Sequence, residues 1–191
     1  MNLVLASTSI YRKELLNRLG LPFVTDAPAV EESRRGDESP RHLVQRLAEA
    51  KARAVAPRHP DALIIGSDQV ATVDGRILGK PGDHDQAVAQ LRLAAGKRLE
   101  FLTGLCVLNA RNGTAQVEVI PCAVVFRPLS EEQIENYLRR ERPYHCAGSF
   151  KSEALGIALC ERFEGEDPNA LIGLPMIRLI HMLEQEGVSV I

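Results

Sequence analysis

Residues Asn2–Arg12 read NLVLASTSIYR, and this stretch decides the fold of the first part of the chain. A short apolar run, Asn2–Ala6, leads into the hydroxyl-rich Ser7–Ser9, and an amphipathic segment begins at Ile10. This order predicts a strand, a turn and the first turn of a helix. Backbone N–H groups at such a helix start, together with the guanidinium of Arg12, suit a phosphate. A serine before a helix is more often only a cap, so this stretch alone leaves both interpretations open.

The bulk composition is that of an ordinary globular protein. The chain has 191 residues, of which 45% are hydrophobic and 25% charged, and its net charge is −2. No linker divides it, so we expect one domain over residues 1–191, with room for two lobes. The small net charge gives no general reason to bind nucleic acid or an anionic membrane. No apolar run approaches the about 20 residues of a membrane span, and no signal peptide is recognisable, so we expect a cytoplasmic protein.

The cysteines and the hydroxyl groups form no recognisable nucleophilic or metal site. The cysteines stand at Cys106, Cys122, Cys146 and Cys160. Their irregular spacing, without a C-x-x-C pair, argues against a zinc or redox motif. Three of them have apolar neighbours in the sequence and are expected to be small buried thiols. No G-x-S-x-G motif is present, so a covalent serine is not expected.

Caps, turns and apolar periodicity predict the remaining elements. Helices are expected at Ile10–Leu19, from Pro40 onward, at Asp83–Ala95, from Ser130 to Arg140 and from Pro175 to near Gly187. Strands are expected at Phe23–Thr25, Ala62–Gly66, Val70–Val73, Arg76–Leu78, Leu99–Leu108, Ala115–Phe126 and Gly156–Cys160. This order predicts an α/β fold with a mixed central sheet and flanking helices.

Asp68 is the sharpest catalytic candidate in the sequence. It follows the continuous apolar run Ala62–Gly66, which predicts a buried strand with ligands at its carboxyl end. A carboxylate there can hold a divalent cation or accept a proton from water. An aspartate that caps a turn is an equally good interpretation of this position alone.

Three further charged residues are candidates for the same site. Lys51 lies close to the apolar stripe of its predicted helix, where a lysine either extends to water or reaches an anion. Glu31 could join Asp68 around one Mg²⁺, which keeps several waters when bound. Lys80 lies in G-K-P, which is not a P-loop. Taken singly, Glu31 and Lys80 are better interpreted as surface charges.

Several short motifs then occur together, in order, along essentially the whole chain. They are A-S-x-S-x-x-R at Ala6–Arg12, V-E-E at Val30–Glu32, the helical Lys51, I-G-S-D-Q at Ile65–Gln69, L-G-K-P at Leu78–Pro81 and A-G-S-F at Ala147–Phe150. This set resembles the Maf family of nucleoside triphosphate pyrophosphatases. The resemblance implies a two-lobed, elongated α/β fold similar to that of inosine triphosphate pyrophosphatases. It also implies hydrolysis of a nucleoside triphosphate to a monophosphate and pyrophosphate with a divalent metal cation, Mg²⁺ or Mn²⁺.

Carried over position by position, the resemblance implies roles for the matching residues. Asp68 would be the proton acceptor and, with Glu31, a metal ligand. The phosphate and metal site would contain Ser7, Arg12, Glu31, Lys51 and Lys80. These charges suit the reaction, because expelling pyrophosphate requires neutralisation of the triphosphate.

The base specificity of the family depends on three positions, which are Tyr11, Gln69 and Glu153 in this chain. Family members that act on dTTP and UTP typically carry Arg, Thr and Gln at these three places, whereas this chain resembles the branch that acts on 7-methyl-GTP. Methylation at N7 makes the guanine ring cationic, and Tyr11 can stack on that cation. Glu153 can accept hydrogen bonds from the guanine N1–H and amine. This chain departs from the branch in having Tyr11 where Trp is typical.

The resemblance therefore implies a small-molecule nucleotide as the partner, no nucleic acid and no membrane, and it is compatible with a homodimer. Two alternatives stay open. One is a dTTP/UTP pyrophosphatase of the same family. The other is a non-catalytic regulator of cell division and septum formation, which acts through partner contacts.

Overall fold

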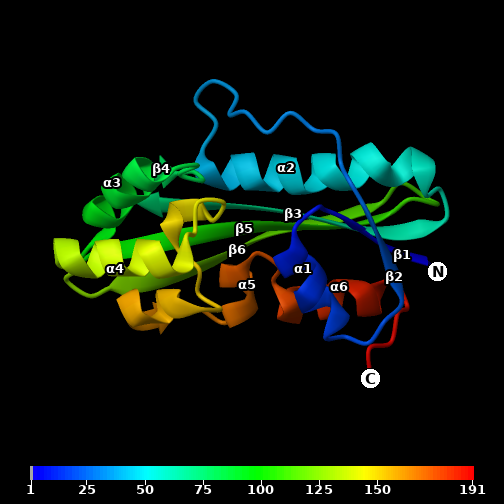
Figure 1. The fold of residues 1–191 in the computed structure, drawn as a ribbon. Coiled ribbons are helices and arrows are strands. Elements are labelled where there is room, and N and C mark those ends of the chain that lie inside the picture. The colour runs from blue at the N-terminus through cyan, green and yellow to red at the C-terminus, as the bar shows by residue number, and fades with distance from the viewer. Residues whose placement is uncertain (1) are drawn as a thin grey trace. The chain divides into compact units, whose positions relative to one another are not determined.

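The computed structural model describes residues 2–191 and has a central sheet with seven strands (Figure 1). The strands are β1 (Asn2–Ala6), β2 (Phe23–Asp26), β3 (Ala62–Val73), β4 (Arg76–Leu78), β5 (Arg98–Asn109), β6 (Ala115–Phe126) and β7 (Cys160–Glu164). Their order is β2-β1-β3-β5-β6-β7, and β4 pairs with β3. Strand β1 runs parallel to β2 and β3, whereas β4 and β7 are antiparallel to β3 and β6. The predicted α/β class with a mixed central sheet is confirmed.

The helices begin where the sequence places their caps. They are α1 (Ile10–Asn17), α2 (Pro40–Val55), α3 (His84–Ala94), α4 (Glu131–Glu141), α5 (Pro168–Ile172) and α6 (Met176–Gln185). The side chains of Ser9, Ser39, Asp83 and Ser130 accept the expected N-cap hydrogen bonds. The five predicted helices are therefore present, and α5 is an additional short helix that the sequence did not predict.

The strand predicted at Gly156–Cys160 is wrong. Residues Leu155–Leu159 form a 3₁₀ helix, and strand β7 starts only at Cys160. At Gly156 the chain turns back on itself, because the Gly156 N–H donates to the Lys151 carbonyl at 3.1 Å. Pairing with β6 begins where this turn ends, between Cys160 and Phe126.

The chain forms two compact units. Unit 1 contains residues 2–69, 102–120 and 167–191, and unit 2 contains residues 70–101 and 121–166. Strands β3, β5 and β6 contribute residues to both units. Among residues 2–191, no helix has the length and the apolar character that a membrane span requires.

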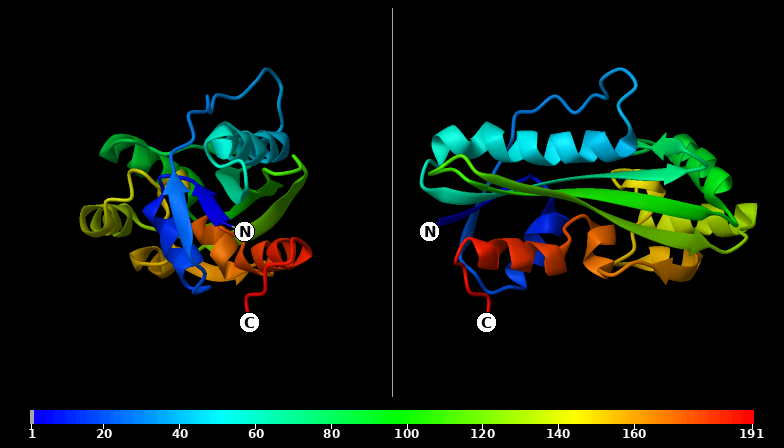
Figure 2. Two further views of the ribbon diagram at one scale, coloured as in Figure 1. Left: turned by 90° about the vertical axis from the view of Figure 1, so that its right-hand side faces the viewer. Right: turned by 180° about the vertical axis from the view of Figure 1, so that it is seen from behind.

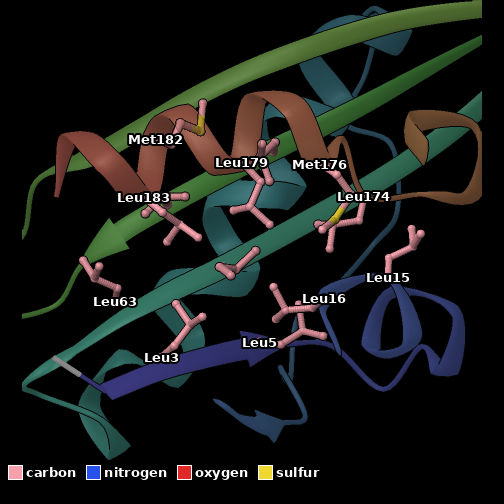
Figure 3. Packing of buried hydrophobic residues seen from close by; sticks show 13 residues of the cluster. Leu3, Leu5, Leu15, Leu16, Leu63, Leu174, Met176, Leu179, Met182 and Leu183 are labelled. Carbon is pink, nitrogen blue, oxygen red and sulfur yellow. The ribbon is translucent and has the colours of Figure 1, made fainter. Parts of the chain in front are cut away.

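Unit 1 buries both faces of its part of the sheet. Along β1, Leu3 and Leu5 join one hydrophobic cluster, and Val4 and Ala6 join another. Figures 1 and 2 show α2 on one face of these strands and α1 and α6 on the other. Figure 3 shows leucine and methionine side chains of α6 packing over Leu3, Leu5 and Leu63. A two-sided core explains why the strand sequences are continuously apolar.

Two glycines bring the backbone of α2 directly against the sheet. A Cβ at Gly66 would lie 2.1 Å from the carbonyl oxygen of Ala48, and one at Gly104 would lie 2.1 Å from that of Val44. Any side chain at either position would push the helix away. The glycines therefore seat α2, which carries Lys51, on the strand that carries Asp68.

Unit 2 has an aromatic core of its own. The ring of Phe150 lies 5.9 Å from that of Phe101 and 5.2 Å from that of Phe126. Beside it, the buried Tyr137 hydroxyl donates to the Ser149 carbonyl at 3.1 Å.

The cysteines are less buried than expected. Two of the four, Cys106 and Cys122, are buried, whereas Cys146 and Cys160 are only partly buried. Burial raises the pKa of Cys106 to about 12 and that of Cys160 to about 11. These two thiols are therefore protonated at neutral pH and poor nucleophiles.

Candidate functional site

Lys51 and Asp68 form a buried ion pair in unit 1. Lys51 comes from the middle of α2 and Asp68 from β3, and both are less than 10% exposed. The Lys51 ammonium donates to Asp68 Oδ1 at 2.6 Å and also lies 2.6 Å from Glu32 Oε1. Burying charges is costly unless they are paired, so this arrangement is more than a lysine that extends to water. The Lys51 side chain reaches the two carboxylates instead of extending to water, and its binding of a substrate anion stays a prediction.

Glu32, and not its neighbour Glu31, makes the contact with Lys51. The Glu31 carboxylate is exposed and accepts a hydrogen bond from Ser33 at 2.7 Å. Glu31 still faces the same cluster electrostatically. The pKa of Arg46 is raised mainly by its hydrogen bonds to Glu38, and further by the charges of Asp68 and Glu31. Glu32 is thus a member of the site that sequence reasoning missed.

Arg12 contributes the second cation of the cluster. It lies in the first turn of α1, and its Nε donates to the carbonyl of Gly173 at 2.8 Å. Burial lowers the pKa of Arg12, while the charges of Asp68 and Glu32 oppose that shift. This coupling places Arg12 near Asp68 and Glu32, and the role of these residues as one functional site stays a prediction.

Ser7 and Ser9 shape the turn that leads into α1. The Ser7 hydroxyl accepts from the Ser9 N–H at 3.1 Å, and the Ser9 hydroxyl accepts from the Arg12 N–H at 3.4 Å. Strand β1 pairs in parallel with β3, with Leu5 opposite Ile65. The chain therefore leaves strand β1 at Ser7, close to the β3 residues that precede Asp68. The cap interpretation holds for Ser9, and the phosphate role of Ser7 stays a prediction.

Tyr11 and Gln69 also lie in unit 1 and are partly buried. Tyr11 precedes Arg12 on α1, and Gln69 follows Asp68 on β3. The side-chain nitrogen of Gln69 donates to Thr103 Oγ1 at 2.9 Å and to the Ala170 carbonyl at 2.7 Å. Its amide is therefore held by the protein rather than free to rotate.

Lys80 and Glu153 belong to unit 2, and both are exposed. Within this unit the L-G-K-P and A-G-S-F motifs lie together, because the Gly148 N–H donates to the Gly79 carbonyl at 3.2 Å. Gln90 joins the two motifs by donating to the Gly79 carbonyl at 3.1 Å and accepting from the Ser149 hydroxyl at 2.7 Å. Two motifs about 70 residues apart in sequence thus form one local structure.

The charges of the unit 1 cluster balance. Arg12 and Lys51 carry two positive charges, and Asp68 and Glu32 carry two negative ones. Such a site can orient a water molecule and hold phosphate oxygens, but it has no spare positive charge for a triphosphate. Among residues 2–191, no group of three or more His, Cys, Asp and Glu side chains could hold a metal ion.

A cavity of about 560 Å³ lies elsewhere in unit 1, along residues 2–4, 22–24 and 58–62. None of the predicted site residues lines it. It therefore adds nothing to the candidate site.

Comparison with known proteins shows the family of this chain and several similar proteins. Residues 2–186 match the Maf family, described as "Maf-like protein". A "7-methyl-GTP pyrophosphatase" of Nitrosococcus oceani is 57% identical over 189 residues, which cover 99% of this chain and 95% of that protein. A protein of the same name from Methylobacillus flagellatus is also 57% identical, over 99% of this chain and 98% of its own length.

A solved structure, that of the Staphylococcus aureus Ham1 protein, aligns with 66% of this chain and 72% of its own at 12% identity, with a TM-score of 0.47. The family match, by contrast, spans nearly all of the sequence and includes every motif quoted above. The chain belongs to the Maf family.

Proposed function

We propose that this protein hydrolyses 7-methyl-GTP to 7-methyl-GMP and pyrophosphate, and so removes a modified nucleotide. Water attacks the α-phosphorus, the bond from that phosphorus to the oxygen that bridges the α- and β-phosphates breaks, and pyrophosphate leaves with the bridging oxygen. The observation that carries the proposal is the buried pair of Lys51 and Asp68, which also meets Glu32. The relatives named 7-methyl-GTP pyrophosphatase, at 54–57% identity, support the choice of substrate.

Asp68 is the proposed proton acceptor. A carboxylate with one oxygen held by Lys51 keeps a defined orientation, and it can take a proton from the attacking water. Arg12 and Lys51 are proposed to bind phosphate oxygens and to stabilise the charge that develops on the leaving pyrophosphate. Ser7 and Lys80 are assigned to the phosphates on the family resemblance.

A divalent cation, Mg²⁺ or Mn²⁺, is part of the proposal. Asp68 and Glu32 accept from the same ammonium at 2.6 Å each, so their oxygens lie close together. Carboxylate oxygens are suitable ligands for both cations, and Mg²⁺ is commonly bound by one or two carboxylates plus substrate phosphates. Asp68, with Glu31 or Glu32, would hold the ion. When bound it would supply the positive charge that the balanced cluster lacks.

Base selectivity is assigned to Tyr11, Gln69 and Glu153. Tyr11 is proposed to stack on the cationic 7-methylguanine ring, and Glu153 to accept hydrogen bonds from its N1–H and amine. Glu153 lies in unit 2, and its role rests on the resemblance.

The test is pyrophosphate release with Mg²⁺ or Mn²⁺ from 7-methyl-GTP, GTP, dTTP, UTP and CTP, compared as kcat/KM. A preference for 7-methyl-GTP supports the proposal. A preference for dTTP or UTP would keep the chemistry and overturn the substrate. If no nucleotide releases pyrophosphate, the proposal that the protein is an enzyme would be overturned, and a regulator of cell division would be favoured.

We further propose that the protein works in the cytoplasm, with a nucleotide and not a nucleic acid as its ligand. A homodimer is also part of the proposal. Light scattering on the purified chain tests the dimer.

A further inference from the structure

We propose that the segment Asp167–Gly173 positions two substrate-contacting groups, the Arg12 guanidinium and the Gln69 amide, and that Ser67 and Thr103 are the positioning residues that fix these contacts. The inference rests on the proposed function, because it assigns Arg12 to the phosphates and Gln69 to the base. All of these residues lie in unit 1.

The segment is itself firmly anchored. Asp167 is 2% exposed, and its two carboxylate oxygens accept from the Asn169 N–H at 2.9 Å and the Ile177 N–H at 2.8 Å. It caps α5 and is also bonded to the start of α6. The carbonyl groups that follow it in the chain are therefore held in place.

The Gly173 carbonyl orients Arg12. It accepts from Arg12 Nε at 2.8 Å and from the fully buried Ser67 hydroxyl at 2.9 Å, whose single proton is shared with the Gly104 carbonyl, also at 2.9 Å. Gly173 has a φ of +116°, and a Cβ there would lie 3.4 Å from Arg12 Nε. The contact thus needs glycine for its backbone conformation.

Gln69 is oriented by acceptors alone. Its Nε2 faces Thr103 Oγ1 at 2.9 Å and the carbonyls of Ala170 at 2.7 Å and Leu171 at 3.3 Å. The Thr103 hydroxyl donates its own proton to Ala170 at 2.9 Å, so it can only accept from Gln69. Because carbonyl oxygens cannot donate, the amide nitrogen must lie on this side. The amide oxygen must then point away from these three groups.

That oxygen is available to a ligand. Within residues 2–191, Gln69 Oε1 accepts no hydrogen bond, and no buried side-chain oxygen lacks a partner, so Oε1 reaches solvent. Guanine presents three donor hydrogens, N1–H and two on the amine, so one amine hydrogen remains for Gln69 beside the two assigned to Glu153, whereas uracil presents one N–H between two carbonyl oxygens. A fixed acceptor at Gln69 therefore favours guanine over uracil.

The two contacts have separable consequences. Loss of the Thr103 hydroxyl frees the Gln69 amide to rotate and affects base selectivity. Loss of the Ser67 hydroxyl loosens the Gly173 carbonyl and, through Arg12, affects the phosphates that all nucleotides share. A merely structural role would move both properties together or neither.

The experiment compares kcat and KM for 7-methyl-GTP and UTP in wild type, Thr103→Val, Thr103→Ser and Ser67→Ala. We expect Thr103→Val to lower the ratio of the two kcat/KM values about 3- to 10-fold, the effect of one hydrogen bond. Thr103→Ser keeps the hydroxyl and should restore the ratio. Ser67→Ala should raise KM for both nucleotides by one common factor and leave the ratio unchanged.

Thr72→Val is the matched control, since it also removes a strand hydroxyl but lies in unit 2, where the Thr72 hydroxyl donates to the Glu100 carbonyl at 3.5 Å. Circular dichroism checks folding, and Thr103→Ala replaces Thr103→Val if that variant does not fold. An unchanged ratio in a folded Thr103 variant would overturn the inference. A wild type that releases no pyrophosphate would instead overturn the proposed function.

Discussion

The ammonium of Lys51 lies 2.6 Å from a carboxylate oxygen of Asp68 and 2.6 Å from one of Glu32, and the proposed chemistry depends on these two contacts. From the sequence, Lys51 and Asp68 were candidates for the site. Each also had a non-functional interpretation, a lysine that extends to water and an aspartate that caps a turn. The sequence analysis also predicted that an acid of the V-E-E motif lies near Asp68. It assigned this place to Glu31, whereas Glu32 makes the contact with Lys51. The segment around these acids is irregular, so no helix or strand periodicity indicates which side chains point toward the site. Sequence reasoning therefore could not tell which of the two adjacent glutamates contacts Lys51.

We predict that Asp68→Asn lowers kcat for 7-methyl-GTP by about 100-fold or more while the protein stays folded. An amide keeps the size of the side chain but cannot accept the proton from water. Lys51 retains Glu32 as a partner, which limits the structural cost. Steady-state kinetics and circular dichroism measure the two properties. Asp61→Asn, an exposed aspartate of unit 1, is the control. Near-normal turnover in Asp68→Asn would contradict the assignment.

Tyr11→Trp should raise kcat/KM for 7-methyl-GTP about 2- to 5-fold, because indole is the stronger partner for a cationic ring. Tyr11→Leu should lower it. Neither change should affect UTP, whose base is neutral. Equal effects on the two nucleotides would show that Tyr11 serves packing and not base stacking.

At the scale of elements, the predictions succeeded where the signal is local. Caps such as Ser39 and Ser130 gave the starts of α2 and α4, and turn residues gave the long pair β5 and β6. Helix α5 was missed because five residues are too few to show periodicity. Gly173, next to it, contacts Arg12 across 161 residues of sequence, and no local pattern reports such a contact.

The end of strand β2 carries an ion pair that should make stability depend on pH. Asp26 is bonded to Arg58 and His59, and these hydrogen bonds lower the pKa of Asp26 to about 2. The pKa of Asp26 is lower in the folded protein than in the unfolded chain, where it is near 4, so ionised Asp26 stabilises the fold above about pH 4. This stabilisation is lost as the pH falls to about 2.

The free energy of unfolding of wild type minus that of Asp26→Asn should therefore be largest above about pH 4 and shrink between about pH 4 and 2. Urea titrations monitored by circular dichroism at several pH values measure this difference. A difference that stays constant with pH would mean that the Asp26 ion pairs do not stabilise the fold.

For the molecule as a whole, the metal should enter with the substrate. Chelation by EDTA should abolish pyrophosphate release, and Mg²⁺ or Mn²⁺ should restore it. The same ions at millimolar concentration should leave the Tm of the nucleotide-free protein unchanged, because residues 2–191 offer no group of three or more acidic, His or Cys ligands. A clear rise of Tm with the metal alone would contradict this order of binding.

The contact between Gly66 and the backbone of α2 sets a rule for how this protein can change over time. The separation of Lys51 and Asp68 depends on two main chains that touch, and hardly on the side chains around them. Lineages can therefore remodel the outer surface of α2 freely, in response to temperature, solubility or new neighbours, without disturbing catalysis. They cannot gain even one methyl group at Gly66 without displacing α2, because the added carbon would lie 2.1 Å from the carbonyl oxygen of Ala48.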